Sequence, residues 1–450
     1  MTYDLIIKNA KVLIPKQINL DLRSELKSES LDVAILNGKI AAIGSFASSQ
    51  ATRVIDATHL HLLPGIIDSQ VHFREPGLTH KEDLESGTRA ALLGGVTCIF
   101  EMPNTSPSTT NEDAFRFKLE RARNRCHTHY AFFMGGSPEN YAQLGQLEQL
   151  PHCSGVKVFM GSSTGTLLVE DDSHLEKILN HTKRRVIFHC EDEYRLRERK
   201  KIFADSKDPK DHPQWRDEES AFLATKRIVT LAKKTHHPIH ILHVTTQQEM
   251  EFLANYKAFV SVEVLPQHLT LSAPECYERW GTLAQQNPPI RNQIHQHSLW
   301  KAITDNVVDV IGSDHAPHTA EEKSRGYPQT PSGMPGVQTI LPIMLDHVNN
   351  GRLSLEKLTQ MMTENVRDIF KMKNKGRIQV GMDADFTLVD MNKRVQITNQ
   401  WIASKSKWTV FDGKWVTGWP TQVILKGQLT MSDDTIIIPH SGEGADFDIS

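Results

Sequence analysis

Apolar segments that stop on a histidine or an aspartate recur along the middle of this 450-residue chain, and this pattern most constrains its fold. In the clearest case, Asp309-Val310-Ile311-Gly312 predicts a buried strand, and Asp314, His315 and His318 follow it in a proline-containing turn. The pattern recurs at residues 68–72, at Phe188-His189 and at Leu242-His243. Because imidazole and carboxylate groups bind metal ions, such strand ends predict a metal site at the C-terminal mouth of a barrel.

The middle of the chain, residues 60–378, alternates apolar segments with amphipathic ones such as 81–93 and 218–235, which predict helices. Eight segments predict strands: 65–72, 96–102, 129–134, 155–159, 186–189, 239–243, 259–264 and 307–313. Eight strands alternating with helices are what a (β/α)8 TIM barrel of the α/β class requires. A doubly wound open sheet is the alternative, but it would gather its ligands at one switch point rather than at several strand ends.

Both ends of the chain carry short strand patterns. They fall at residues 3–13, 33–44, 384–390 and 408–416. Neither end alone offers enough strands for a stable sheet. We therefore expect residues 1–59 and 379–450 to form one small composite β-sandwich domain beside a barrel of residues 60–378.

Three polar segments predict irregular structure. Residues 16–31 predict a surface loop, and the acidic residues 430–450 predict a loosely held tail. Residues 313–336 are rich in glycine, proline, serine and threonine. A long loop of this kind at a barrel mouth usually binds substrate, so we expect a lid there.

The composition excludes several classes of protein. A formal charge of −3 gives no basic field for nucleic acid, so an anionic small molecule needs a local cationic pocket. No apolar run approaches the roughly 20 residues that span a bilayer, and the N-terminus has no signal-like segment. The five cysteines form no Cys-x-x-Cys pair, which is typical of reduced thiols in a cytoplasmic enzyme.

Lys157 lies inside an apolar strand, where an ammonium group is costly. One interpretation is a lysine whose head reaches the strand end and pairs with an acid. The other is a carbamate formed with CO2, because burial lowers the pKa of the amine and the neutral amine reacts. The carbamate oxygens could bridge two metal ions, and a two-metal site holds a hydroxide near neutral pH.

Four motifs together resemble the cyclic amidohydrolases of the amidohydrolase superfamily. They are Pro64-Gly65-Ile66-Ile67-Asp68 with Val71-His72-Phe73-Arg74-Glu75-Pro76-Gly77, then Met102-Pro103-Asn104-Thr105, Lys157-Val158-Phe159-Met160, and Ser313-Asp314-His315-Ala316-Pro317-His318. The first two motifs resemble the dihydroorotases within that superfamily. The resemblance extends over nearly the whole chain, and it implies reversible cyclisation of N-carbamoyl-L-aspartate to dihydroorotate in pyrimidine synthesis.

The resemblance also implies roles for individual residues. The metal ligands, with Zn²⁺ as the expected ion, are His72 for a first ion, carboxylated Lys157 as the bridge, His189 and His243 for a second ion, and Asp314. Asp314 also shuttles the proton between the attacking hydroxide and the ring nitrogen. The residues expected to hold the substrate are Arg74, Asn104 and His318 at its carboxylate, Asn287 at the ring, and the backbone of Gly333-Met334-Pro335-Gly336 in the lid.

The chain departs from the family pattern at position 70. The family begins its site with His-x-His, whereas this chain reads Gln70-Val71-His72. An amide oxygen is a poorer Zn²⁺ ligand than an imidazole, so Gln70 ligates weakly or not at all, and the first ion is partly occupied or absent. A second departure is Pro266-Gln267-His268, where relatives often have two histidines, and it carries no firm consequence.

Two other functions stay open at this point. One is a weak or inactive dihydroorotase-like partner of aspartate transcarbamoylase, although the retention of most expected site residues speaks against it. The other is an allantoinase or hydantoinase, whose substrates lack the carboxylate on the ring carbon. Relatives are often dimers, so a homodimer is expected.

Overall fold

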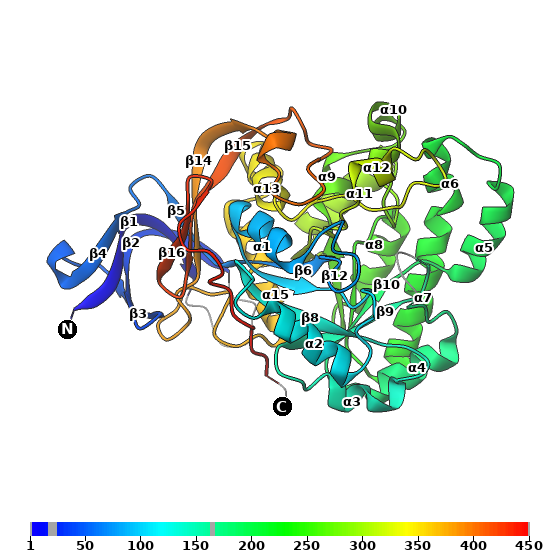
Figure 1. The fold of residues 1–450 in the computed structure, drawn as a ribbon, viewed down its shortest axis with the longest axis horizontal. Coiled ribbons are helices and arrows are strands. Elements are labelled where there is room, and N and C mark those ends of the chain that lie inside the picture. The colour runs from blue at the N-terminus through cyan, green and yellow to red at the C-terminus, as the bar shows by residue number, and fades with distance from the viewer. Residues whose placement is uncertain (1, 17–24, 163–166, 449–450) are drawn as a thin grey trace.

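A barrel of eight parallel strands forms the centre of the computed structural model, which describes residues 2–16, 25–162 and 167–448 (Figure 1). The strands are β6 (Ile66–Val71), β7 (Val96–Glu101), β8 (His129–Gly135), β9 (Cys153–Phe159), β10 (Val186–His189), β11 (Ile239–Ile241), β12 (Val260–Val264) and β13 (Val310–Ile311). Val71 closes the ring by a parallel bridge to His315, just beyond β13. Each predicted strand overlaps one of these, so the predicted barrel is confirmed and the open sheet was the wrong alternative.

Helices surround the barrel (Figure 1). The two helices predicted above are α1 (Leu84–Leu93) and α7 (Glu218–Thr235), and each begins at an aspartate whose carboxylate accepts a backbone N–H of the first turn. The others are α2 (Glu112–Ala122), α3 (Leu144–Leu147), α4 (Asp172–His181), α5 (Glu193–Ile202), α6 (His212–Trp215), α8 (Gln247–Leu253), α9 (Pro266–Thr270), α10 (Glu275–Trp280), α11 (Gln293–Thr304), α12 (Ala320–Lys323), α13 (Ile340–Asn349), α14 (Leu355–Met362) and α15 (Glu364–Phe370). Among the described residues, no helix has both the length and the apolar character that crossing a bilayer requires.

Strands from both termini form a second sheet of nine strands (Figure 1). They are β1 (Tyr3–Pro15), β2 (Leu26–Leu36), β3 (Lys39–Gly44), β4 (Ala51–Asp56), β5 (His61–Pro64), β14 (Phe386–Gln396), β15 (Trp415–Leu425), β16 (Gln428–Ser432) and β17 (Thr435–Ile436). Antiparallel pairing of β5 with β14 joins the two halves. The expected sandwich is therefore one continuous sheet, and β5 carries it past the expected boundary at residue 59.

Two of the predicted irregular segments are more ordered than expected. β1 extends to Pro15, which pairs with Leu26 at the start of β2, so only part of 16–31 is a loop, and residues 17–24 lie outside the described residues. The C-terminal segment is not a loose tail. Ala445 donates its backbone N–H to the carbonyl of Tyr130 over 2.8 Å, and the Phe447 ring lies 5.5 Å from that of Phe100. Ala445 and Phe447 are both buried, and these contacts hold the end of the segment against the barrel.

Candidate active site

The predicted metal ligands gather at the C-terminal mouth of the barrel. Gln70 belongs to β6, Lys157 to β9 and His189 to β10, while His72, His243 and Asp314 follow β6, β11 and β13. All six line one small cavity with about 20 Å³ of free space. Parallel strands bring their carboxyl ends to one rim, which is why residues far apart in sequence meet here.

The acceptor at the centre of the site is the carboxylate of Asp314. Its Oδ1 accepts a hydrogen bond from Nε2 of Gln70 at 3.0 Å, and Nε2 of His72 lies 3.1 Å from the same oxygen. On the other side of the cavity, Nδ1 of His189 lies 3.1 Å from Nε2 of His243. The polar atoms expected to bind metal thus contact one another. Within the described part of the chain, no three His, Cys, Asp or Glu side chains form a metal-ligand cluster.

Several buried polar atoms of the cavity still lack a partner within the described residues. They are Oε1 of Gln70, Nζ of Lys157 and Nδ1 of His243. A buried polar atom without a partner costs about 1–3 kcal/mol, so unpartnered atoms at one cavity indicate a ligand that completes them. Burial holds the pKa of His72, His189 and His243 below the ordinary histidine value, which keeps the imidazoles neutral, as metal ligation requires.

Lys157 is a buried lysine whose Nζ has no hydrogen-bond partner among the described residues. Its side chain is 1% exposed, and its Nζ lies 4.2 Å from the centre of the Phe159 ring. Burial lowers the pKa of the Lys157 amine from 10.5 to about 7. No acid pairs with it in the described residues, so the interpretation as a lysine paired with an acid is not borne out. With this pKa, a substantial fraction of the amine is neutral and nucleophilic near pH 7.

Backbone strain accompanies the site. Arg74, His243 and Asp314 have φ values of 62°, 37° and 44°, in the left-handed region that non-glycine residues rarely occupy. Such conformations cost about 1–3 kcal/mol each and persist only where the surroundings enforce them, typically at functional sites. Here they turn three side chains of the strand ends toward the cavity.

A buried acid behind His189 was missed by the sequence analysis. Oε2 of Glu191 lies 2.9 Å from Nε2 of His189, and Nε of Arg216 donates to Oε1 of Glu191 over 3.0 Å. Although burial opposes it, Arg216 and His189 hold the pKa of the Glu191 carboxyl well below its usual range. The carboxylate fixes the ring so that Nδ1 of His189 faces the cavity. The His-x-Glu spacing at the strand end could have indicated Glu191, whereas nothing in the sequence pairs it with Arg216.

The expected carboxylate-binding residues lie beside the cavity. Arg74 is 1% exposed; its Nε donates to the Pro317 carbonyl over 3.3 Å, and its Nη2 lies 3.3 Å from Nε2 of His318. Nη1 of Arg74 has no partner in the described residues. Nζ of Lys81 contacts the other ring nitrogen of His318 at 3.2 Å. A buried guanidinium with an open N–H edge is a site for a planar anion such as a carboxylate.

Of the other residues expected to bind substrate, Asn287 lies at the cavity, whereas Asn104 and Gly336 contact histidines instead. Asn287 lines the cavity, and Oδ1 of Asn104 lies 2.8 Å from Nδ1 of His72, which makes Asn104 a partner of that ring. Gly336 was expected to present backbone groups to the substrate, but its N–H donates to Nδ1 of His315 over 3.1 Å. Gly333, at the start of the same predicted segment, lines the cavity. Met334 forms a parallel bridge with His315, and this pairing leaves the preceding Gly333 beside the cavity.

The mouth of this (β/α)8 barrel combines imidazoles, a carboxylate and a buried lysine, which together suit a metal ion. The model of the amidohydrolase family matches residues 61–430, and the chain belongs to this family.

Comparisons with individual proteins agree. The chain is 32% identical over 411 residues to a dihydroorotase of Methanothermobacter thermautotrophicus, covering 91% of this chain and 92% of that protein. It is 36% identical over 386 residues to a dihydroorotase of Pyrococcus abyssi, covering 85% and 86%. Among solved structures, it is similar to an L-hydantoinase (dihydropyrimidinase) from Arthrobacter aurescens, with a TM-score of 0.92, 27% identity, and coverage of 99% of this chain and 100% of that one.

Proposed function

We propose that this chain is a metal-dependent dihydroorotase that interconverts dihydroorotate and N-carbamoyl-L-aspartate. The observation that carries this proposal is Arg74, a buried guanidinium with an unpartnered Nη1 beside the cavity. Dihydroorotate has a carboxylate on its ring carbon, and hydantoin and allantoin do not. The dihydroorotase relatives, at 30–36% identity, support the same substrate.

The residues at the barrel mouth fit a divalent metal ion, and we propose Zn²⁺. Lys157, His189, His243 and Asp314 would hold it, because their donor atoms line one cavity and some of them have no other partner among the described residues. A bound ion supplies an acidic water and polarises an amide carbonyl. The neutral amine of Lys157 is suited to carry the CO2-derived carbamate.

The two halves of the site differ in ligand strength. His189 and His243 offer two imidazoles on one side, whereas His72 and the amide of Gln70 stand on the other. The Gln70 amide nitrogen also faces Asp314. There it donates a hydrogen bond and offers no lone pair to a metal ion. We therefore propose one well-bound ion on the His189 side and a weak or empty position on the Gln70 side.

The side chains of this chain perform the remaining steps. In the hydrolytic direction, Asp314 accepts the proton of the attacking water and returns it to the departing ring nitrogen. Both contacts described above engage Oδ1 of Asp314, and they hold the carboxylate in place for this transfer. Arg74 and His318, which contact each other, bind the substrate carboxylate, and Asn287, which lines the cavity, contacts the ring.

We also propose that the protein is a cytoplasmic homodimer. Aspartate transcarbamoylase is a second candidate partner to test. All five cysteines are buried and unpaired, which suits a reducing compartment. Size-exclusion chromatography with light scattering, alone and with the transcarbamoylase, measures both associations.

A substrate panel tests the proposed function. The Zn²⁺-loaded protein is assayed with dihydroorotate, hydantoin and allantoin under the same conditions. We expect turnover of dihydroorotate with a kcat/KM at least tenfold above that of the other two. Preference for hydantoin would reassign the activity. A protein that takes up no Zn²⁺, converts none of the three compounds and still binds the transcarbamoylase would favour the partner role.

A further inference from the structure

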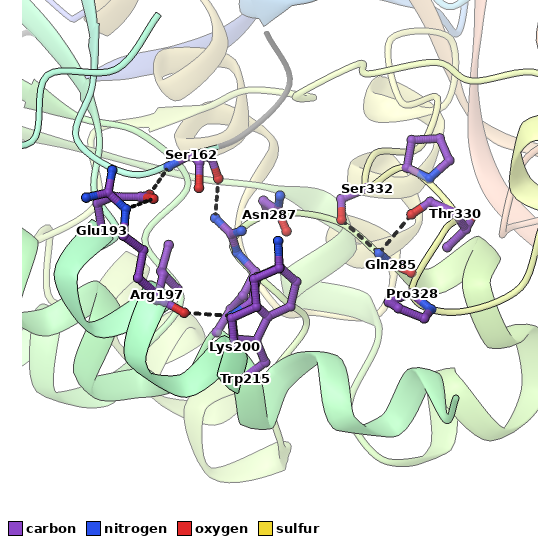
Figure 2. A pocket seen from close by; sticks show the side chains of 13 residues that line it. Ser162, Glu193, Arg197, Lys200, Trp215, Gln285, Asn287, Pro328, Thr330 and Ser332 are labelled. Carbon is purple, nitrogen blue, oxygen red and sulfur yellow. Dashed lines mark hydrogen bonds and ion pairs between the residues drawn. The ribbon is translucent and has the colours of Figure 1, made fainter. Parts of the chain in front are cut away.

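A cleft of about 640 Å³ opens beside the catalytic cavity and shares Asn287 and Ser332 with it (Figure 2). The catalytic cavity itself has only about 20 Å³ of free space. Figure 2 shows Arg197, Lys200 and Trp215 on one side of the cleft and Gln285, Thr330 and Ser332 on the other. A compound that reaches the cavity past these shared residues crosses the cleft first.

The charges of the cleft are predominantly positive, but most of them are already paired. Arg197 lies 2.6 Å from Glu170 and 3.1 Å from Glu193, and Arg216 is held by Glu191. Glu193 also accepts the backbone N–H of Ser162 over 2.6 Å. The neighbouring carboxylates therefore offset the positive charges of both arginines.

Lys200 is the exception. It is an exposed residue of α5 that forms no ion pair with any described residue, and its Nζ lies 5.8 Å from the centre of the Trp215 ring. Nε1 of Trp215 donates to the Leu196 carbonyl over 2.9 Å, which fixes the indole face under the ammonium. The indole therefore holds the ammonium at the cleft, and no carboxylate of the described residues offsets its charge.

The opposite wall offers a hydrogen-bond acceptor. Nε2 of Gln285 donates to Oγ of Ser332 over 3.0 Å, which fixes the amide, and Gln285 is 3% exposed. Its Oε1 has no partner among the residues that the structure describes. A buried amide oxygen in this state suits a ligand that brings its own N–H donor.

We propose that this cleft is the capture site for the open-chain, ureido-dicarboxylate form of the substrate, with Lys200 attracting its second carboxylate. The inference rests on the proposed function. The ring-opened compound has two carboxylates and a ureido group with N–H donors, and the cavity offers one guanidinium, Arg74, for one carboxylate. Lys200 provides the cationic group for the other during approach, and Gln285 accepts from the ureido group.

Attraction of this kind acts on encounter and not on the reacting bonds. Replacing Lys200 should therefore lower kcat/KM, leave kcat nearly unchanged, and lose its effect when salt screens the charge. One equilibrium constant links the two directions of the reaction. Consequently kcat/KM must fall by the same factor for the open-chain and the cyclic compound.

The experiment compares Lys200→Glu with Lys201→Glu, which makes the same change of net charge at the next position of α5, outside the cleft. At low ionic strength, we expect Lys200→Glu to lower kcat/KM by about 3- to 10-fold, Lys201→Glu to lower it by less than twofold, and the difference to vanish at about 0.5 M salt. Lys200→Arg should restore the wild-type value, and the melting temperatures should agree.

Each other outcome decides against the inference. If the two glutamate variants behave alike, or if the loss persists at high salt, the cleft does not capture the substrate although the proposed function stands. A wild-type enzyme that converts neither compound overturns the proposed function and this inference with it.

Discussion

Gln70 and Asp314 lie side by side at the ends of β6 and β13, the two strands that close the barrel, and Nε2 of Gln70 donates a hydrogen bond to Oδ1 of Asp314 over 3.0 Å. The amide therefore places an N–H group beside the carboxylate, where an imidazole ligand would place a lone pair. Oε1 of Gln70 is buried and has no partner in the described residues. This contact is the physical basis for expecting unequal metal occupancy.

Substitution Gln70→His should raise the bound Zn²⁺ from about one to about two equivalents per chain. An imidazole is the stronger ligand, and a change in the ligand environment of this kind alters metal affinity by about 10- to 100-fold. Plasma mass spectrometry after dialysis against metal-free buffer measures the ratio. Gln267→His is the control, because Gln267 is also a buried glutamine near the site but donates to the Ser313 carbonyl, and it should add no ion. Two equivalents in the wild type would contradict the unequal site.

Substitution Arg74→Gln should lower kcat/KM for dihydroorotate by roughly 10- to 150-fold, the equivalent of losing a charged hydrogen bond of about 1.5–3 kcal/mol. Any residual hydrolysis of hydantoin, which lacks the carboxylate, should change little. The matched control is Arg116→Gln, an exposed arginine of α2 that pairs with Glu112. Equal losses on both substrates would argue against a role for Arg74 in recognising the carboxylate.

Substitution Glu191→Gln should weaken Zn²⁺ binding by about 10- to 100-fold, because the amide orients His189 less firmly and leaves Arg216 without its acid. Competition with a chromophoric chelator measures the dissociation constant. Glu249→Gln serves as the control. Glu249 is another buried acid, which accepts from Thr225 over 2.7 Å, so this change should lower stability but leave metal affinity intact. A normal metal affinity in Glu191→Gln would show that Glu191 does not position His189 for metal binding.

Lys157 should make the metal-free protein more stable as pH rises. Its folded pKa of about 7 lies below the unfolded value of 10.5, so between these values the unfolded state binds the extra proton. The unfavourable contribution is full below pH 7 and fades as pH approaches 10.5. Relative to Lys157→Met, the free energy of unfolding of the wild type should rise by about 1.4 kcal/mol per pH unit in this window. Urea titrations from pH 7 to 9 measure it. Parallel curves would mean that Lys157 is solvated or paired.

The sequence was sufficient for the barrel and for most of the site, because both depend on local patterns. An apolar run that ends on His189 or Asp314 specifies a strand and its polar end together. The partners of these groups depend on tertiary packing instead. Arg216, which follows α6, contacts Glu191, and the N–H of Gly336 donates to His315; no spacing along the chain indicates either contact. Phe447 likewise fixes the C-terminal segment through rings distant in sequence.

The central claim is that side chains from separate strands share one divalent ion at the barrel mouth. Anomalous diffraction from crystals of the Zn²⁺-loaded enzyme, recorded on both sides of the zinc absorption edge, tests it most directly. The account predicts a strong peak about 2.0–2.2 Å from donor atoms of His189, His243 and Asp314, beside the modified end of Lys157, and a weak or missing peak beside Gln70. A cavity without any anomalous peak in the loaded enzyme, or an ion bound elsewhere, would contradict it.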